Sequence, residues 1–364
     1  MFSEKSKKNA DACRFCWMCR YLCPVQLVTG KETNTPRARG LQVSMMERGM
    51  TMDRECARNM FECMLCGACA NDCATGYDPL VFIREARTQA WIQDLVPPEV
   101  AKVADLISET GSMYGKKEPL VSFDGIPEKG EVLVWLGETA RCSTPESARA
   151  LFSVLAKAGV SFAALPGEPA SGAVLGDLMG FVEEVRQAAL RAAEAIRTSG
   201  ARQVIVLDSY DAAFMTHECR DWGIALPEVT TAAAYIAGLI REGRLKPEKT
   251  PEKITYHDGS RLARDLGEHE EPREILRAMG YTISEMWQNR RLARCCGSAL
   301  AGRYMPEIRR MTAENRWNDA KRTDAKLLCA ACPQSTEALR ETVPEGYRYE
   351  DLFVLLDRHL QAAR

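Results

Sequence analysis

Two cysteine runs with the same spacing lie within the first 73 residues of the chain. Each run reads C-x2-C-x2-C-x3-C, the pattern that holds paired iron–sulfur clusters, in which the fourth cysteine of each run binds the other cluster. We therefore predict two [4Fe–4S] clusters that transfer single electrons. Their crossed ligand sets are Cys13, Cys16, Cys19 and Cys73 for the first cluster, and Cys63, Cys66, Cys69 and Cys23 for the second.

The composition of the chain argues against other uses of these cysteines. Residues 1–11 are polar and lack the apolar core of a signal peptide, so we expect the fifteen cysteines in a reducing cytoplasm, where disulfides are rare. Two zinc sites would not need thiolates in this order. The net charge of −2 predicts no nucleic-acid partner. Without an apolar run of about twenty residues, membrane association is expected only through a partner.

A second group of cysteines lies near the C-terminus. Cys295–Cys296–Gly297 is followed by Cys329-x2-Cys332-Pro333. Four thiolates are enough for a [4Fe–4S] cluster, a [2Fe–2S] cluster or a tetrahedral zinc ion. We predict a third iron–sulfur cluster, with zinc as the alternative, at Cys295, Cys296, Cys329 and Cys332.

Together with the upstream block Tyr256–His257–Asp258–Gly259–Ser260, this pattern resembles the cysteine-rich CCG domain of heterodisulfide reductases. The wider chain is similar to the CCG-domain subunit of heterodisulfide reductase and to the iron–sulfur subunits of glycolate, lactate and anaerobic glycerol-3-phosphate dehydrogenases. The resemblance implies a noncubane cluster held by five cysteines in each motif. Here Gly259 and Ser260 replace the usual Pro and Cys, and a serine alkoxide is a poor substitute for a thiolate. We therefore expect an electron relay at this site rather than a catalytic centre.

The elements that must position these cysteines change character along the chain. Around the first two runs, helical spacing of apolar residues occurs at 35–49, 53–64, 79–94 and 99–109. Further on, short apolar runs alternate with amphipathic helices, which predicts parallel strands at 131–137, 203–208, 253–257 and 325–330. The predicted fold class is α+β and multidomain. It comprises an all-α two-cluster ferredoxin domain at 1–96, a helix and linker at 97–130, and two α/β CCG-type half-domains at 131–250 and 251–364.

The first α/β half-domain reads as a copy of the second that has lost its thiolates. In our alignment Glu138 matches Ser260, and Ala170–Ser171–Gly172 matches Cys295–Cys296–Gly297. Asp208 and Asp211 then match Cys329 and Cys332. We predict a scaffold or docking surface without a cluster. The alternative is a hard cation bound by the oxygens of Glu138, Asp208 and Asp211.

Together these patterns predict an electron-transfer subunit of a larger oxidoreductase. A flavoprotein partner, resembling a 2-hydroxy acid dehydrogenase or an electron-transfer flavoprotein, would exchange single electrons with the clusters, which would exchange them with another carrier. The chain has no dinucleotide fingerprint and no P-loop, and we predict no catalytic residue. Two alternatives are a catalytic subunit that reduces a disulfide at the C-terminal cluster and an assembly module with a structural zinc.

Overall fold

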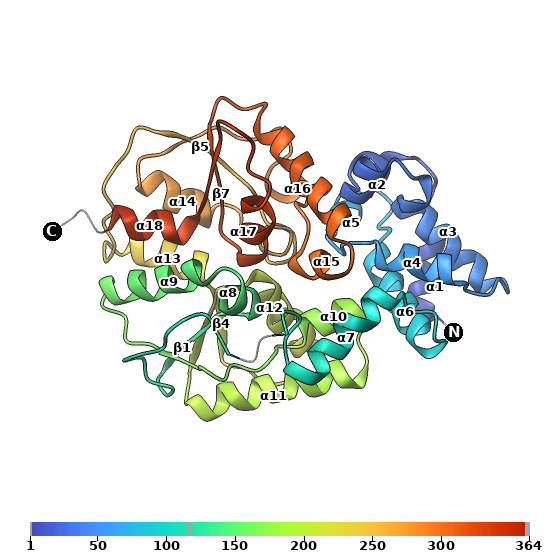
Figure 1. Cartoon of the computed structure of the whole chain (residues 1–364), viewed down its shortest axis with the longest axis horizontal. Helices are drawn as coiled ribbons and strands as arrows, with labels where there is room; N and C mark the ends of the chain where they lie inside the picture. The colour runs from blue at the N-terminus through green and yellow to red at the C-terminus, as the bar shows by residue number, and fades with distance from the viewer. Residues whose placement is uncertain (1, 116–117, 361–364) are drawn as a thin grey trace.

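The computed structural model describes residues 2–115 and 118–360, and the first of these segments is built of helices (Figure 1). Its helices are α1 (Glu4–Asp11), η1 (Met18–Tyr21), α2 (Pro24–Thr29), η2 (Glu32–Asn34), α3 (Pro36–Glu47), α4 (Arg54–Phe61), α5 (Ala68–Asn71), α6 (Pro79–Ile92) and α7 (Pro98–Thr110). Polar caps set where three of them begin. The side chains of Thr35, Asp53 and Asp78 accept hydrogen bonds from the first turns of α3, α4 and α6.

Two parallel four-stranded sheets follow, and they have the same strand order. The first runs β2-β1-β3-β4 and the second β6-β5-β7-β8. The strands of the first sheet are β1 (Val132–Trp135), β2 (Ala163–Ala164), β3 (Gln203–Val206) and β4 (Glu228–Thr231). Those of the second are β5 (Lys253–Tyr256), β6 (Thr282–Ile283), β7 (Leu327–Ala330) and β8 (Arg348–Asp351). The chain is therefore a mixed α and β protein whose second part contains an internal repeat.

Helices connect and cover these strands. In the first half they are α8 (Glu138–Cys142), α9 (Pro145–Lys157), α10 (Ala173–Met179), α11 (Glu183–Ser199), α12 (Ser209–Phe214), η3 (Met215–Cys219) and α13 (Ala232–Arg241). In the second half they are η4 (Arg261–Asp265), α14 (Glu271–Ala278), η5 (Arg290–Leu292), α15 (Ala299–Tyr304), α16 (Pro306–Ala320), α17 (Pro333–Arg340) and α18 (Leu352–His359). Across the described part of the chain, no helix combines the length and apolarity needed to span a bilayer.

Strand pairing shows which residues of the two halves are equivalent. Val206 of β3 pairs with Thr231 of β4, and Ala330 of β7 pairs with Asp351 of β8. Thr231 and Asp351 each cap the helix that follows, α13 or α18. Val206 and Ala330 therefore occupy the same place in the two sheets.

This register corrects part of the sequence alignment. Asp208 lies just beyond the end of β3 and caps α12, while Cys332 lies just beyond the end of β7 and caps α17. Asp208 is therefore equivalent to Cys332, and Asp211 is equivalent to Ser335. The sequence alignment, which matches Asp208 and Asp211 with Cys329 and Cys332, is therefore wrong by three residues. The pairs Cys329/Cys332 and Cys332/Ser335 have the same spacing, so the sequence alone does not distinguish them.

The match of Glu138 with Ser260 holds in the structure. Each follows a glycine, Gly137 or Gly259, at the end of the first central strand of its half. A Cβ atom on Gly137 would meet the aspartate pair of the first half, and one on Gly259 would meet the Cys–Ser pair of the second. Equivalent side chains therefore face the glycine in both halves, with room for a Cβ atom at Gly259 and none at Gly137.

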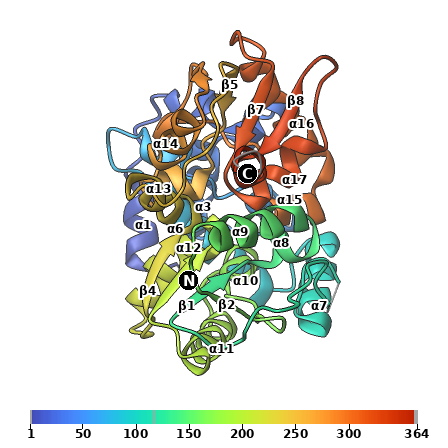
Figure 2. The ribbon, with the colours of Figure 1, turned by 90° about the vertical axis from the view of Figure 1, so that its left-hand side faces the viewer.

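The two α/β halves share one hydrophobic core. Val134 and Ile205 of the first sheet belong to the same buried cluster as Ile254 and Cys329 of the second. Helix α9 packs against α18, and α13 packs against α14. Figure 2 shows the halves stacked, with the green strands β1 and β2 below the orange and red strands β5 and β7.

The helical unit is fixed to both halves by packing and by one buried carboxylate. Helix α6 packs on α10, α7 on α15 and α2 on α16. Asp177 of α10 lies 3.1 Å from the guanidinium of Arg84 in α6 and 2.7 Å from that of Arg261 in the second half. Arg87 of α6 donates a hydrogen bond to the carbonyl of Asp177. All three parts of the chain therefore meet at Asp177.

Candidate metal centres

The two N-terminal cysteine runs adopt the same backbone conformation. Phe15 and Trp17 have positive φ angles of 51° and 69°, and the equivalent Leu65 and Gly67 have φ angles of 46° and 73°. Positive φ is uncommon outside glycine and clusters at functional sites. In both runs the second residue after the first cysteine donates its backbone N–H to that cysteine's sulfur at 3.4 Å. The repeated spacing in the sequence is thus a repeated loop in space.

The predicted ligands of the second cluster come together from both runs. One small cavity is lined by all four of them, together with apolar residues of α2, α5 and α6. The four are Cys63, Cys66, Cys69 and Cys23. Burial raises the pKa of Cys23 to about 11 and places that of Cys69 well above its usual value. Such thiols stay neutral without a metal, and a coordinating metal deprotonates them.

The predicted ligands of the first cluster lie nearer the surface. Cys16 is exposed, and Cys13, Cys19 and Cys73 are half-buried. The Thr75 hydroxyl lies 3.2 Å from the Cys73 sulfur and donates a hydrogen bond to the carbonyl of Ala12, next to Cys13. The fourth cysteine of the second run therefore stands beside the first run, as the crossed ligand set requires.

Large apolar side chains are exposed on the loop of the first run. Phe15, Trp17, Met18 and Tyr21 retain 47%, 45%, 59% and 62% of their accessible surface. The Arg37 guanidinium stacks 3.4 Å from the centroid of the Trp17 ring. Exposed apolar groups gathered in this way are typical of a contact surface for another molecule.

The C-terminal site forms around the loop before α15 and the start of α17. Cys295 and Cys296 precede Gly297, whose φ of 96° turns the chain between them and α15. The side chain of Ser260 hydrogen-bonds Cys295, and that of Ser335 hydrogen-bonds Cys296. From the first half, the Ser209 hydroxyl lies 3.0 Å from the sulfur of Cys332.

The structure does not bring Cys329 to these three thiols. Side chains alternate between the faces of a strand, and in β7 Leu328 and Ala330 pack in the same cluster as Cys296, whereas Cys329 packs in the core shared by both halves. The hydroxyl of Ser335 lies on the thiol side instead. Sequence reasoning missed Ser335 because a CxxC word ends at Cys332, although the same spacing continues from Cys332 to Ser335.

The C-terminal site touches the second cluster site directly. The side chains of Cys66 and Cys295 interact with each other, and this interaction raises the pKa of Cys66 and lowers that of Cys295. Arg264 holds the two loops together. Its guanidinium donates to the carbonyl of Cys66 at 2.8 Å, to the carbonyl of Ala293 at 2.6 Å and to the hydroxyl of Ser260 at 2.7 Å.

The equivalent site in the first half is built from oxygen atoms. Ser171, equivalent to Cys296, donates a hydrogen bond to Asp211 at 2.5 Å, and the indole of Trp135 donates to the same carboxylate at 2.9 Å. Burial raises the pKa of Glu138 to about 7. Glu168, which sequence reasoning missed, accepts hydrogen bonds from the backbone of Leu136 and Gly137.

A site for a single metal ion requires several ligand side chains that converge on one point. Among residues 2–115 and 118–360, no three His, Cys, Asp or Glu side chains come close enough together to hold one metal ion. The arrangement required by the hard-cation alternative at Glu138, Asp208 and Asp211 is therefore not found in that part of the chain. Cluster ligands differ, since each thiolate of a cubane binds its own iron.

Three cysteines lie outside the motifs. Cys56, Cys142 and Cys219 are all buried. His257 is also buried, and its Nδ1 accepts a hydrogen bond from Arg316 at 3.0 Å. These residues belong to the packing around the sites.

Comparison with known proteins points to the same region of the chain. Residues 254–339 match the CCG family model, described as a cysteine-rich domain. The chain is 28% identical over 362 residues to a subunit of the dihydromethanophenazine:CoB–CoM heterodisulfide reductase of Methanosarcina mazei, with 89% of this chain and 86% of the relative covered. The predicted resemblance to CCG-domain iron–sulfur oxidoreductase subunits is thereby confirmed.

Two longer relatives carry a similar region. The protein named "Probable membrane-anchored ferredoxin" of Chromohalobacter salexigens is 26% identical over 309 residues, covering 79% of this chain and 46% of the relative. The EtfAB:quinone oxidoreductase of Syntrophomonas wolfei is 26% identical over 294 residues, covering 75% of this chain and 41% of the relative. The chain thus spans less than half the length of these two proteins. The comparisons as a whole indicate an iron–sulfur oxidoreductase subunit that works in a complex.

Proposed function

We propose that this chain relays single electrons between a flavoprotein partner and another carrier through three iron–sulfur sites in series. The observation that carries this proposal is the contact between Cys66 and Cys295. Cys66 belongs to the second predicted cluster and Cys295 to the C-terminal site, so an electron on one has a direct route to the other. Arg264 keeps this contact in place by binding both loops.

The order of the relay follows from exposure. The predicted ligands of the first cluster lie near the surface beside exposed apolar side chains, which supports a docking point for a redox partner there. The predicted ligands of the second line a cavity formed with α2, α5 and α6, and the thiols of the third site are buried. We propose that the flavoprotein docks at the loop of residues 15–21, in the reducing cytoplasm that the free thiols require.

The ligand sets of the first two clusters are proposed as the sequence predicts them. For the third, we propose a cluster held by Cys295, Cys296 and Cys332, with the hydroxyls of Ser260 and Ser335 beside it. We leave Cys329 out of the proposed set, because it packs in the core shared by both halves, whereas its neighbours Leu328 and Ala330 pack with Cys296. When bound, the clusters supply one-electron chemistry, and the chain contributes burial, hydrogen bonds to sulfur and the spacing between sites. We also propose the division of the chain into a ferredoxin domain at 1–96, a helix and linker at 97–130, and two CCG-type half-domains at 131–250 and 251–364.

Metal analysis and EPR spectroscopy of anoxically purified protein test this function. The relay predicts iron beyond the about eight atoms of two [4Fe–4S] clusters, and a third signal that does not change when a thiol or disulfide is added. A third signal that shifts with disulfide would indicate catalysis at the C-terminal site. About eight irons with one zinc would indicate an assembly module instead.

The EtfAB:quinone oxidoreductase and the heterodisulfide reductase subunit among the relatives support a redox partner for the chain. Co-purification from the native host identifies that partner. Recovery of a flavoprotein with the chain supports the proposed relay, and recovery of the chain with no redox protein contradicts it.

A further inference from the structure

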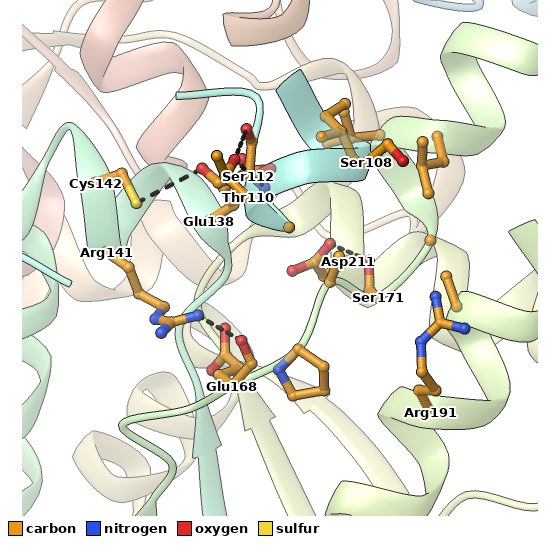
Figure 3. Close-up of a pocket in the computed structure, with 18 of the residues that line it drawn as sticks. Ser108, Thr110, Ser112, Glu138, Arg141, Cys142, Glu168, Ser171, Arg191 and Asp211 are labelled. Carbon is orange, nitrogen blue, oxygen red and sulfur yellow. Dashed lines mark hydrogen bonds between the residues drawn. The ribbon is translucent and has the colours of Figure 1, made fainter. Parts of the chain in front are cut away.

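The first α/β half contains a cavity of about 710 Å³ at the place where the second half carries its thiols (Figure 3). Its walls come from α7, α8, α10, α11 and the loop of residues 167–172. A volume of this size accommodates a small organic molecule. The proposed relay assigns no role to this space.

Carboxyl groups dominate the polar lining of this cavity. Among residues 2–115 and 118–360, two arginines line it, Arg141 and Arg191, against six carboxyl-bearing residues: Asp105, Glu138, Glu168, Glu184, Asp208 and Asp211. In Figure 3 the labelled side chains of Glu138, Glu168 and Asp211 lie around the open space. The innermost part of the cavity is therefore acidic.

The two arginines do not balance this charge. The Arg141 guanidinium donates hydrogen bonds to the backbone carbonyls of Glu168 at 2.5 Å and Pro166 at 2.6 Å, so its donors are directed at the loop. Arg191 is an exposed residue of α11. Glu138 accepts its hydrogen bonds from Met113 and Ser112, which are uncharged donors. Buried carboxylates of this kind gain when a cation pairs with them.

Burial raises the pKa of Glu138 and of Glu168 to about 7 each, and it also raises that of Asp211. The charge of Arg141 lowers the pKa of Glu168 without cancelling the effect of burial, whereas at Glu138 and Asp211 uncharged hydrogen-bond donors oppose burial. An added cation would lower all three pKa values further. A second feature points to a ligand: Thr139 lines the cavity and is fully buried, and within the described residues its hydroxyl interacts with Tyr114 but makes no well-formed hydrogen bond.

The spread of these groups determines the kind of cation. A metal ion needs several ligands that converge on one point, and no three such side chains converge in the described part of the chain. An organic ammonium ion differs, because it carries several N–H donors and can extend a second charged group along the cavity. We infer that the cavity binds a small organic cation with ammonium groups, which donate hydrogen bonds to Glu138, Glu168 and Asp211.

The position of the cavity gives this ligand a way to influence the redox site. Asp208 and Gln334 line the cavity and hydrogen-bond each other at 3.3 Å, and Asp208 also contacts the sulfur of Cys332 at 3.9 Å. A ligand bound in the cavity would therefore lie next to a side chain, Asp208, that contacts a thiol of the second half. The binding claim itself stands whether or not the chain is a relay.

Isothermal titration calorimetry of the holoprotein tests this inference with 1,4-diaminobutane as the probe. The diamine is expected to bind with one-to-one stoichiometry, while 1,4-butanediol, which has the same length and no charge, shows no saturable heat. Magnesium chloride at matched ionic strength is expected to give none either. Failure of the diamine to bind wild-type protein, or equal binding of the diol, overturns the inference without any variant.

Two variants locate the site. E138Q and D211N remove negative charge from the cavity with little change in shape, and each is expected to weaken diamine binding about tenfold or more. The matched control is E268Q, because Glu268 is, like Glu138, a half-buried glutamate, and it hydrogen-bonds Thr231 outside the cavity lining. Unchanged affinity in both cavity variants, or an equal loss in E268Q, contradicts the assignment. Unchanged iron content shows that each variant is folded.

Discussion

Ser260 and Ser335 place hydroxyl groups against the thiols of Cys295 and Cys296. A hydroxyl at such a position donates a hydrogen bond to sulfur. This bond stabilises the reduced cluster, which carries the more negative charge, and so changes the reduction potential of the cluster. The sequence showed the loss at Ser260. The place of Ser335 became visible only once the strand register matched Cys332 and Ser335 with Asp208 and Asp211.

The choice between Cys329 and Cys332 has a direct test. We expect C332A to lose the iron of the C-terminal site and C329A to retain it, because only the Cys332 sulfur lies on the side of the other thiols. Iron and sulfide analysis of the two variants measures this difference. Loss of iron in C329A, or retention in C332A, would show that β7 presents its cysteine differently from the structure.

The buried carboxyl of Glu138 predicts a pH dependence of stability. Burial raises its pKa to about 7, above the value of about 4.3 for an unfolded chain. The native state therefore binds more protons between these values, so this group's contribution to stability is fully present below about pH 4.3 and is lost as the pH rises through 7. Thermal unfolding of wild-type protein and E138Q between pH 5 and 8 should show the variant gaining relative to wild type as the pH rises. A constant difference across this range contradicts the environment assigned to Glu138.

At the scale of elements, the central strands were predictable and the outer ones were not. β1, β3, β5 and β7 lie within the predicted runs because most of their residues are buried in a covered sheet and, apart from Lys253 and Thr255 of β5 and Gln203 of β3, are apolar. β4 and β8 contain residues such as Glu228 and Arg348, since edge strands face solvent, and β2 and β6 span two residues each. No apolar run marks such short strands in the sequence.

The helical unit was predictable for a different reason. The cysteine spacing fixes the local loop, and the caps at Thr35, Asp53 and Asp78 set the starts of α3, α4 and α6. The contact between Cys66 and Cys295 was not predictable, because residues so far apart in the chain meet only through the docking of α6, α7 and α2 on the α/β halves.

The joint between these elements predicts one large effect on stability. Burial alone would raise the pKa of Asp177, but Arg261 and Arg84 outweigh it and hold that pKa below its usual value. Because D177N leaves these two guanidinium groups without their carboxylate, we expect a loss of about 3–5 kcal/mol in the free energy of unfolding. Chemical denaturation measures it. E194Q is the control, since Glu194 is fully exposed and pairs with Arg197 on the same helix.

The same carboxylate gives a second readout. A lowered pKa in the folded state means that the contribution of Asp177 is present above the unfolded value and is lost as the pH falls through the folded one. Wild-type protein should therefore lose stability below about pH 4 by a step that D177N lacks. Parallel acid unfolding curves for the two proteins would exclude Asp177 as the joint.

For the whole molecule, the repeat explains how the chain combines its parts. Two halves with one topology share a core, and the thiol-bearing half faces the second cluster site while the carboxyl-bearing half encloses a cavity. Exposed aromatic side chains at the first cluster leave one end of the series open to a partner. The proposed cluster sites therefore run from the surface to the interior.

The central claim is that the C-terminal site accepts electrons from the second cluster through the contact of Cys66 with Cys295. Redox-poised EPR spectroscopy of anoxic wild-type protein, C332A and C329A tests it most directly, because paramagnetic clusters in adjoining sites split or broaden each other's signals. We predict such an interaction in wild-type protein and C329A, and an isolated second-cluster signal in C332A. Non-interacting signals in wild-type protein, or a C-terminal site without iron, would contradict the relay.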